Sequence, residues 1–208
     1  MDKPLIVGLS ASNRSQLTCD DEVRLARMIE EELHEEDFNI HEAGSDALAR
    51  AMEFSRELAD GLDATTLSNS ETALLVALAS AKDCGVDIEY LSLSRIMRDS
   101  APAREVLLDK LSRCAGVILS SPVYFGDRSS VVQSLLALLY RDPVLATTLA
   151  DKVFTGISVG AKRNGGQETL LIYQLLDFIE FKMFGVGNDS KSTAQYGGTC
   201  TAGRWEPC

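Results

Sequence analysis

The chain has 208 residues, of which 45 % are hydrophobic and 25 % charged, an ordinary composition for a globular protein of one domain. Its formal net charge of −11 argues against a nucleic-acid-binding surface, which needs a cationic footprint. Its apolar runs are far shorter than the roughly 20 residues of a membrane span, and it shows no signal-peptide pattern, so we expect a cytoplasmic protein.

The first predicted strand covers residues 5–9, a short apolar run that is typical of a buried parallel strand. A polar turn at 10–15 follows it. Beyond the turn lies an acidic segment, residues 19–67, with 15 acidic and 4 basic side chains, while the rest of the chain is neutral. Apolar residues such as Ile29, Leu33, Phe54 and Leu58 recur within it at helical spacing. We therefore expect an acidic helical insertion in an otherwise neutral domain.

Strands and helices alternate along the rest of the chain. The predicted strands cover 86–93, 116–119, 152–159 and 183–187, and the predicted helices cover 72–82, 103–113, 129–141 and 167–182. This alternation predicts a parallel sheet with helices on both faces. Ligands of such sheets bind beyond the carboxyl ends of the strands. Three polar or glycine-bearing loops follow strands there, at 10–15, 121–127 and 160–166, and they predict a site on that edge.

Metal and disulfide sites have little support in the sequence. The five cysteines are odd in number and form no C-x-x-C pair, which indicates reduced thiols. Glu31 and His34 have the E-x-x-H spacing of carboxylate-bridged metal sites, but a second copy of that motif is missing. We interpret the acidic segment as a solvated face and expect no metal.

The loop after the first strand is rich in serine. It matches neither the GxxxxGK[ST] pattern of a triphosphate loop nor the GxGxxG pattern of a dinucleotide fold. Hydroxyl groups beside the free N–H groups of a helix start suit a monophosphate. An ordinary strand-to-helix turn with conventional caps is the alternative interpretation.

Several segments together are similar to the motifs of one family. They are Ser-Pro-Val-Tyr-Phe-Gly at 121–126, Asn-Gly-Gly-Gln-Glu-Thr at 164–169 following Gly160, Tyr-Gly-Gly-Thr at 196–199 with Ala-Gly at 202–203, and the serine-rich residues 10–14 and 68–70. On these residues the chain resembles the flavodoxin-like NADPH-dependent FMN reductases, the iron–sulfur flavoproteins and the related quinone reductases. The resemblance covers the chain outside the acidic segment.

The resemblance implies an α/β fold, namely a flavodoxin-like, doubly wound, five-stranded parallel sheet. It implies FMN as cofactor and NAD(P)H as co-substrate, with electrons passing to a small molecule such as a quinone, a flavin or a dedicated substrate. It also implies a homodimer or homotetramer. A non-enzymatic FMN electron carrier is the alternative, favoured by the acidic surface that could steer a partner enzyme. A scaffold without flavin is a third interpretation.

The resemblance also assigns site residues. Those implied for the FMN phosphate are Ser10, Ser12, Arg14, Asn69 and Ser70. Those implied for the flavin ring are Pro122, Val123, Tyr124, Phe125, Gly126, Gly160, Asn164, Gly165, Gly166 and Tyr196. Packing in the core is the alternative role for Tyr124 and Phe125. No protein acid–base pair is required, because the cofactor carries the hydride chemistry.

The chain departs from the family pattern in three respects. It lacks the four-cysteine motif of the iron–sulfur members, so we expect FMN without a cluster. The acidic segment interrupts the phosphate loop between Arg14 and Ser68. The last helix of the fold is missing from the sequence pattern, since the chain reaches Cys208 soon after the fifth strand.

Overall fold

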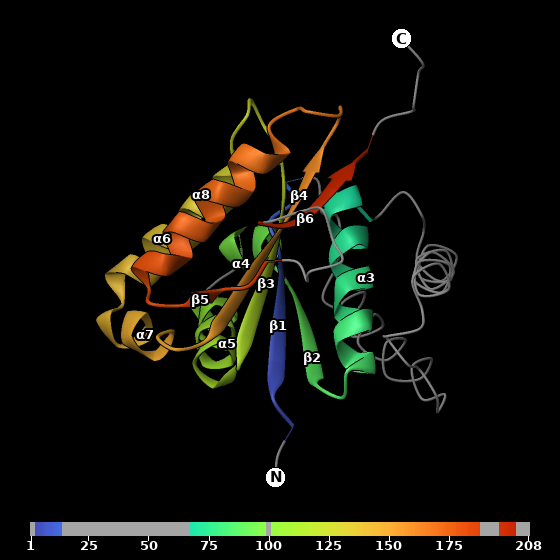
Figure 1. The fold of residues 1–208 in the computed structure, drawn as a ribbon. Helices are drawn as coiled ribbons and strands as arrows, with labels where there is room; N and C mark the ends of the chain where they lie inside the picture. The colour runs from blue at the N-terminus through green and yellow to red at the C-terminus, as the bar shows by residue number, and fades with distance from the viewer. Residues whose placement is uncertain (1–2, 14–66, 99–100, 188–195, 203–208) are drawn as a thin grey trace.

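The computed structural model describes residues 3–13, 67–98, 101–187 and 196–202, and Figure 1 shows its fold. The acidic segment, apart from Leu67, lies outside the described residues, as do Arg14 and the Glu31-x-x-His34 pair. The fold therefore does not test the predictions about these residues. None of the described helices combines the length and the apolar character that crossing a bilayer requires.

A parallel sheet forms the centre of the molecule. Its strands are β1 (Leu5–Ser10), β2 (Asp87–Ser92), β3 (Gly116–Pro122), β4 (Val153–Gly160), β5 (Phe184–Gly185) and β6 (Gly197–Thr201). The strand order is β2-β1-β3-β4-β5, and every pairing is parallel. This confirms the parallel sheet predicted from the alternation of strands and helices, and the doubly wound, flavodoxin-like order that the family resemblance implied.

The fifth position of the sheet is shared by two short strands. β5 pairs with the first two residues of β4, and β6 pairs with Gly156–Gly160 at the other end of the same strand. The sequence predicted a single fifth strand at 183–187 and did not predict β6. The polar, glycine-rich composition of 196–202 explains the omission, because such residues are depleted in strands.

Helices cover the sheet on both faces. They are α3 (Asn69–Asp83), α4 (Leu93–Arg98), α5 (Ala101–Arg113), α6 (Ser130–Arg141), α7 (Pro143–Thr148) and α8 (Gln167–Glu180). Figure 1 shows α3 on one side of the sheet and α5, α6, α7 and α8 on the other. β3 connects the two cores, because Val117 and Leu119 belong to the larger cluster and Ile118 to the cluster under α3.

Two short helices were not predicted. The strand expected at 86–93 ends at Ser92, and Leu93 begins α4, where it is fully buried. α7 follows α6 after a single residue, Asp142. Helices of six residues bury little area and rarely carry a full capping signature, so their sequence signal is weak.

An apolar groove of about 940 Å³ runs along the α3 side of the sheet. Its walls include Val76 and Ala77 of α3, Ile118 and Ile157 of the sheet, and Cys200 of β6. Within the described residues α3 is the one helix on this face, and no helix follows β6.

Candidate functional site

Three loops meet at the carboxyl edge of the sheet, as the strand order predicts. The amide of Val123 donates to the carbonyl of Val159 at 2.9 Å, which joins the loop after β3 to the end of β4. Ser129 is fully buried, and its hydroxyl donates to the carbonyl of Ala11 at 2.7 Å. These contacts hold the loops after β1, β3 and β4 in one cluster.

The start of α3 lies beside the loop after β1. Ser68 caps the helix through a capping box, in which its amide donates to Glu71 Oε2 at 2.7 Å and its hydroxyl accepts from the Glu71 amide. The hydroxyl of Ser120 donates to the carbonyl of Ser70 at 2.8 Å and ties the first turn to β3. The Glu71 amide is taken by Ser68, but the amides of Asn69 and Ser70 have no acceptor within the helix and can donate to an anion.

The predicted phosphate residues of the described chain therefore lie together. Ser10 is at the end of β1, in register with Ser92 and Ser120, and is fully buried. Within the described part of the chain no hydrogen-bond partner accompanies its hydroxyl. Ser12 and Ser70 are also buried, Asn69 is exposed, and the carbonyl of Ser12 accepts from the Ser94 hydroxyl.

The loop after β3 ends in a tight turn. Tyr124 and Asp127 exchange backbone hydrogen bonds of 2.8 and 3.0 Å, and the two residues between them have φ angles of 54° and 79°. Two positive φ angles in a two-residue hairpin make a type I′ turn. Phe125 occupies the first of these positions, and its side chain is fully exposed at 109 %. Phe125 is therefore not a core aromatic, and Tyr124 is only half-buried.

The loop after β4 is closed by the side chain of Gln167. Its Oε1 accepts from the Gly165 amide at 2.7 Å, and its Nε2 donates to the carbonyl of Lys162 at 2.7 Å. The same side chain fills the space beside Gly160, where a Cβ atom would lie 2.5 Å from Nε2. Asn164 and Gly166 both have positive φ angles, of 56° and 103°. The sequence motif is thus needed for this loop conformation as well as for any ligand.

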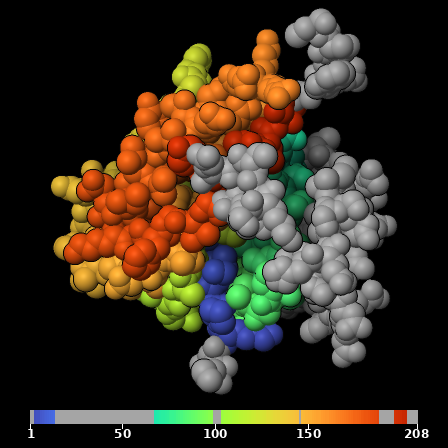
Figure 2. Space-filling view, in the orientation of Figure 1, coloured from blue at the N-terminus to red at the C-terminus, as the bar shows by residue number. Residues whose placement is uncertain are grey.

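Two of the loops are packed backbone against backbone. A Cβ atom on Gly166 would lie 2.9 Å from the Cα atom of Gly126 and 3.3 Å from Val123. No side chain fits between the 124–127 turn and the 160–166 loop at this point. In Figure 2 the same two segments project separately from the top of the molecule, so they diverge above their contact.

A polar pocket of about 630 Å³ opens beside the 160–166 loop. It is lined by Arg163, Asn164, Gly166 and Gln167, together with Thr199 and Thr201 of β6. The sequence did not predict Thr201 as a lining residue. It reaches the pocket only because β6 pairs with β4 as far as Gly160. The alternation of Thr199, Cys200 and Thr201 was the one available signal for a strand there.

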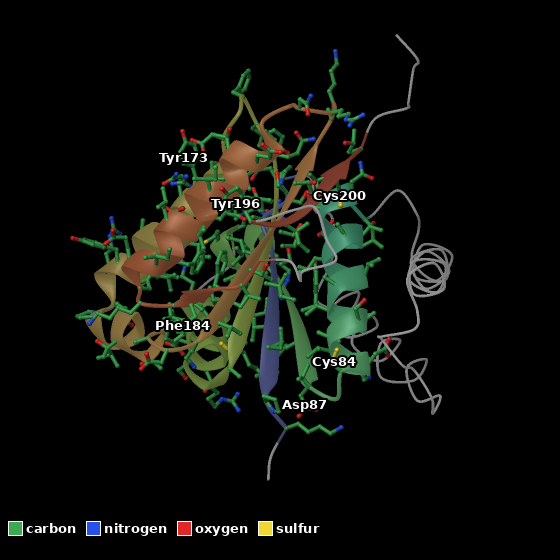
Figure 3. The ribbon with its side chains drawn as sticks, in the orientation of Figure 1. Cys84, Asp87, Tyr173, Phe184, Tyr196 and Cys200 are labelled. Carbon is green, nitrogen blue, oxygen red and sulfur yellow. The ribbon has the colours of Figure 1, made fainter. Side chains whose placement is uncertain are left out.

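The structure does not bring Tyr196 together with the loops. β6 begins beside it at Gly197, which pairs with Gly156 near the middle of β4, whereas the loop edge lies at Thr201 and Gly160. Figure 3 shows the two residues on different sides, with Tyr196 toward α8 and Cys200 beside the upper part of α3. Although Cys200 is exposed, partial desolvation of its thiol beside the α3 groove raises the pKa of that thiol, which favours its neutral form.

A second group missed by the sequence analysis is an ion pair below the turn. Arg128 follows the turn directly, and its guanidinium contacts Asp177 in the third turn of α8. Burial raises the pKa of Asp177, the nearby Arg128 opposes that shift, and Asp127 adds to it. The two partners are 49 residues apart in the sequence, so no local sequence pattern predicts their contact.

The comparisons with known proteins agree with this geometry. The family model of the NADPH-dependent FMN reductases matches residues 63–195. An iron–sulfur flavoprotein of Methanocaldococcus jannaschii is 31 % identical over 156 residues, which cover 67 % of this chain and 80 % of that protein. An iron–sulfur flavoprotein of Methanosarcina thermophila is 28 % identical over 126 residues, covering 58 % of each chain.

Among solved structures, the flavodoxin-like WrbA-like protein of Agrobacterium tumefaciens has a similar fold. The TM-score is 0.50 at 12 % identity, and the match covers 97 % of this chain and 84 % of that one. At this identity the likeness concerns the fold alone, and it agrees with the strand order described above. The extent of the family match and the identity to the M. jannaschii protein show that the chain belongs to the NADPH-dependent FMN reductase family.

Proposed function

We propose that this FMN-dependent oxidoreductase takes a hydride from NAD(P)H and passes the electrons to a small-molecule acceptor, such as a quinone, a flavin or a dedicated substrate. The observation that carries the proposal is the meeting of three loops and one helix start at a single edge of the sheet. When bound there, FMN would supply the hydride-accepting chemistry, and the protein would supply position and electrostatics.

The phosphate fits the start of α3. Ser12, Asn69 and Ser70 bring hydroxyl and amide donors to the positive end of a helix of 15 residues, and Ser10 adds a buried hydroxyl that has no partner in the described chain. Arg14 would complete this cradle. Donors of this kind, without a lysine, are suited to the single phosphate of FMN.

The ring would lie against the other two loops. Pro122 and Val123 lead into the tight turn, and the backbones of Gly126 and Gly166 touch, so a flat group would lie beside this contact, with the turn and the 160–166 loop both close to it. The Gly165 amide already donates to Gln167, so the amide of Gly166, the N-cap residue of α8, is the donor left at the start of this helix, where the helix dipole favours negative charge. Hydrogen-bond donors at that place would stabilise the electron-rich form of the ring.

The decisive experiment identifies the ligand and then the reductant. Heat-released ligand from the purified protein is expected to be FMN by mass spectrometry. Anaerobic addition of NADH or NADPH is expected to bleach the visible flavin absorbance within the time of mixing. Finding FAD, or no flavin after incubation with FMN, contradicts the proposal. A protein that dithionite bleaches but neither nicotinamide bleaches is an electron carrier, the candidate that the acidic segment favours.

Phe125 provides a prediction about this site. Phe125→Asn is expected to leave the free energy of unfolding within about 0.5 kcal/mol of the wild type, because the side chain is exposed and asparagine tolerates a positive φ. Turnover with NAD(P)H is expected to fall roughly fivefold, since an aromatic surface beside the ring is worth about 1 kcal/mol.

The matched control is Tyr140→Asn, which removes another exposed aromatic side chain, this time at the end of α6. Steady-state kinetics and urea denaturation of both variants provide the comparison. Equal turnover in the two variants would mean that Phe125 has no contact with the reacting groups.

A homodimer or homotetramer remains a prediction. It is supported by the outer face of α8, where Ile172, Leu176 and Ile179 are exposed although the helix already packs on the sheet with its other face. A second subunit on this face would cover apolar side chains close to the loop edge.

A further inference from the structure

Arg128 holds an unusual position for a charged residue. It lies between the 124–127 turn and the first residue of α6, and its side chain is only 12 % exposed. Its Nη2 donates to Asp177 Oδ1 at 3.1 Å, and its Nε lies 3.0 Å from Oδ2. Only the Nη2 contact is a hydrogen bond, because Oδ2 is buried without a hydrogen-bond partner in the described chain, so one arm of the guanidinium fork bonds the α8 carboxylate and the other lies close to it as an ion pair.

Further contacts enclose the same guanidinium. It lies over the ring of Tyr173, 5.2 Å from the ring centroid, and Asp127 Oδ1 lies 3.5 Å from Nη1. With its amide oxygen turned toward the guanidinium, Gln133 of α6 accepts at 3.0 and 3.2 Å. The contacts come from the turn, from α6 and from α8, so Arg128 joins three elements.

The ion pair needs both partners. Asp177 is 19 % exposed, and its burial disfavours the charged form that Arg128 stabilises. Removing one member leaves the other charge partly desolvated, which costs far more than the pair contributes at an exposed site. The ion pair is therefore sensitive to changes that an exposed pair would tolerate.

The location of the pair connects the two loops. Arg128 is adjacent to the turn that carries Phe125 and Gly126, and Asp177 belongs to the helix that begins at the 160–166 loop. Ser129, the next residue, is already fixed through its amide to Ser121 and its hydroxyl to Ala11. The base of the turn is thus anchored to the sheet by Ser129 and to α8 by Arg128.

We propose that Arg128 and Asp177 form a clamp that positions the 124–127 turn relative to the 160–166 loop and so sets the slot for the flavin ring. The inference rests on the proposed function, which places the ring against these two loops, beside the contact of Gly126 with Gly166. Neither residue is a catalytic residue. They act by holding backbone that would otherwise shift when the ring enters.

The test uses the full chain and two ligands that share one ring. Asp177→Asn is expected to lower the affinity for FMN and the affinity for riboflavin by the same factor, about tenfold. The ratio of the two affinities should stay that of the wild type, because the phosphate cradle at α3 is untouched. Arg128→Lys keeps the positive charge but loses the forked guanidinium. Its affinity for each flavin should therefore lie between that of the wild type and that of Asp177→Asn. Fluorescence titration gives both dissociation constants, and visible circular dichroism reports the environment of the ring.

The matched control is Asp109→Asn, which breaks the exposed ion pair with Arg113 on α5 and makes the same charge change. It should leave both affinities as in the wild type. The clamp is overturned if Asp177→Asn binds both flavins as the wild type does, or if it loses affinity for FMN alone. If far-ultraviolet circular dichroism shows that Asp177→Asn does not fold, the FMN and riboflavin affinities of Arg128→Lys are compared with those of the wild type instead. An equal loss for both flavins supports the clamp, and no loss, or a loss for FMN alone, overturns it. A wild-type protein that binds neither flavin overturns the proposed function instead.

Discussion

Gly166→Ala is expected to lower the affinity for FMN by roughly a hundredfold, equivalent to about 3 kcal/mol. The added Cβ atom would lie 2.9 Å from the Cα atom of Gly126, and backbone cannot move aside as a flexible side chain can. The φ angle of 103° adds a conformational penalty for any residue with a Cβ. The 160–166 loop would have to move away from the 124–127 turn, and the space for the ring would change. Fluorescence quenching of FMN measures the affinity.

Gly85→Ala separates the effect of a positive φ angle from the effect of a steric clash. Gly85 has a φ of 83° in the turn after α3, and a Cβ atom there would meet nothing within 4 Å. This variant should lose about 1–2 kcal/mol of stability from the backbone alone and keep its affinity for FMN. If Gly166→Ala also bound FMN as tightly as the wild type, the two loops would not flank the ring, and the placement of the cofactor would be wrong.

The central strands were predictable for a physical reason. β1 and β3 are buried along most of their length on both faces, so each includes a continuous apolar stretch, such as Val117, Ile118 and Leu119 in β3. The loops after them carry serine, proline and glycine, which end strands and mark turns. Because parallel strands end at the same edge, the strand order was enough to bring the three loops together.

The outer edge of the sheet was less predictable. β5 has two residues and β6 has five, four of which are exposed in the structure. A strand of that kind is held by pairing with β4 and by the close approach of glycine, and neither leaves a hydrophobic pattern. For the same reason the sequence placed Tyr196 at the site, since a motif gives the residue but not its distance along the strand from the loop edge.

Side-chain contacts across long sequence separations were not predictable either. Arg128 and Asp177 look like ordinary surface residues in the sequence, and only the tertiary fold brings the segment before α6 beside α8. Phe125 shows the opposite case, because an aromatic residue in an apolar context suggests the core. Its place at a positive φ in a two-residue turn instead directs the side chain into solvent.

Gly197→Ala is expected to detach β6 from the sheet. Its φ angle is 133°, and a Cβ atom there would collide with the carbonyl oxygen of Gly156 on β4. Because that carbonyl belongs to a central strand, the clash can be relieved only by moving β6. We expect a loss of about 3 kcal/mol in the free energy of unfolding. Amide hydrogen exchange at Thr199 and Thr201 should become much faster than in the wild type.

Gly198→Ala is the matched control in the same strand. A Cβ atom at Gly198 would lie 3.6 Å from Ile157, which is ordinary van der Waals contact, and it would extend the apolar wall of the groove beside α3. This variant should keep the exchange rates of β6 and lose little stability. If both alanine variants behaved alike, the close approach at Gly156 would not be what holds β6. If neither affected exchange, β6 would open locally even in the wild type, and the pocket that Thr199 and Thr201 line would lack a fixed wall.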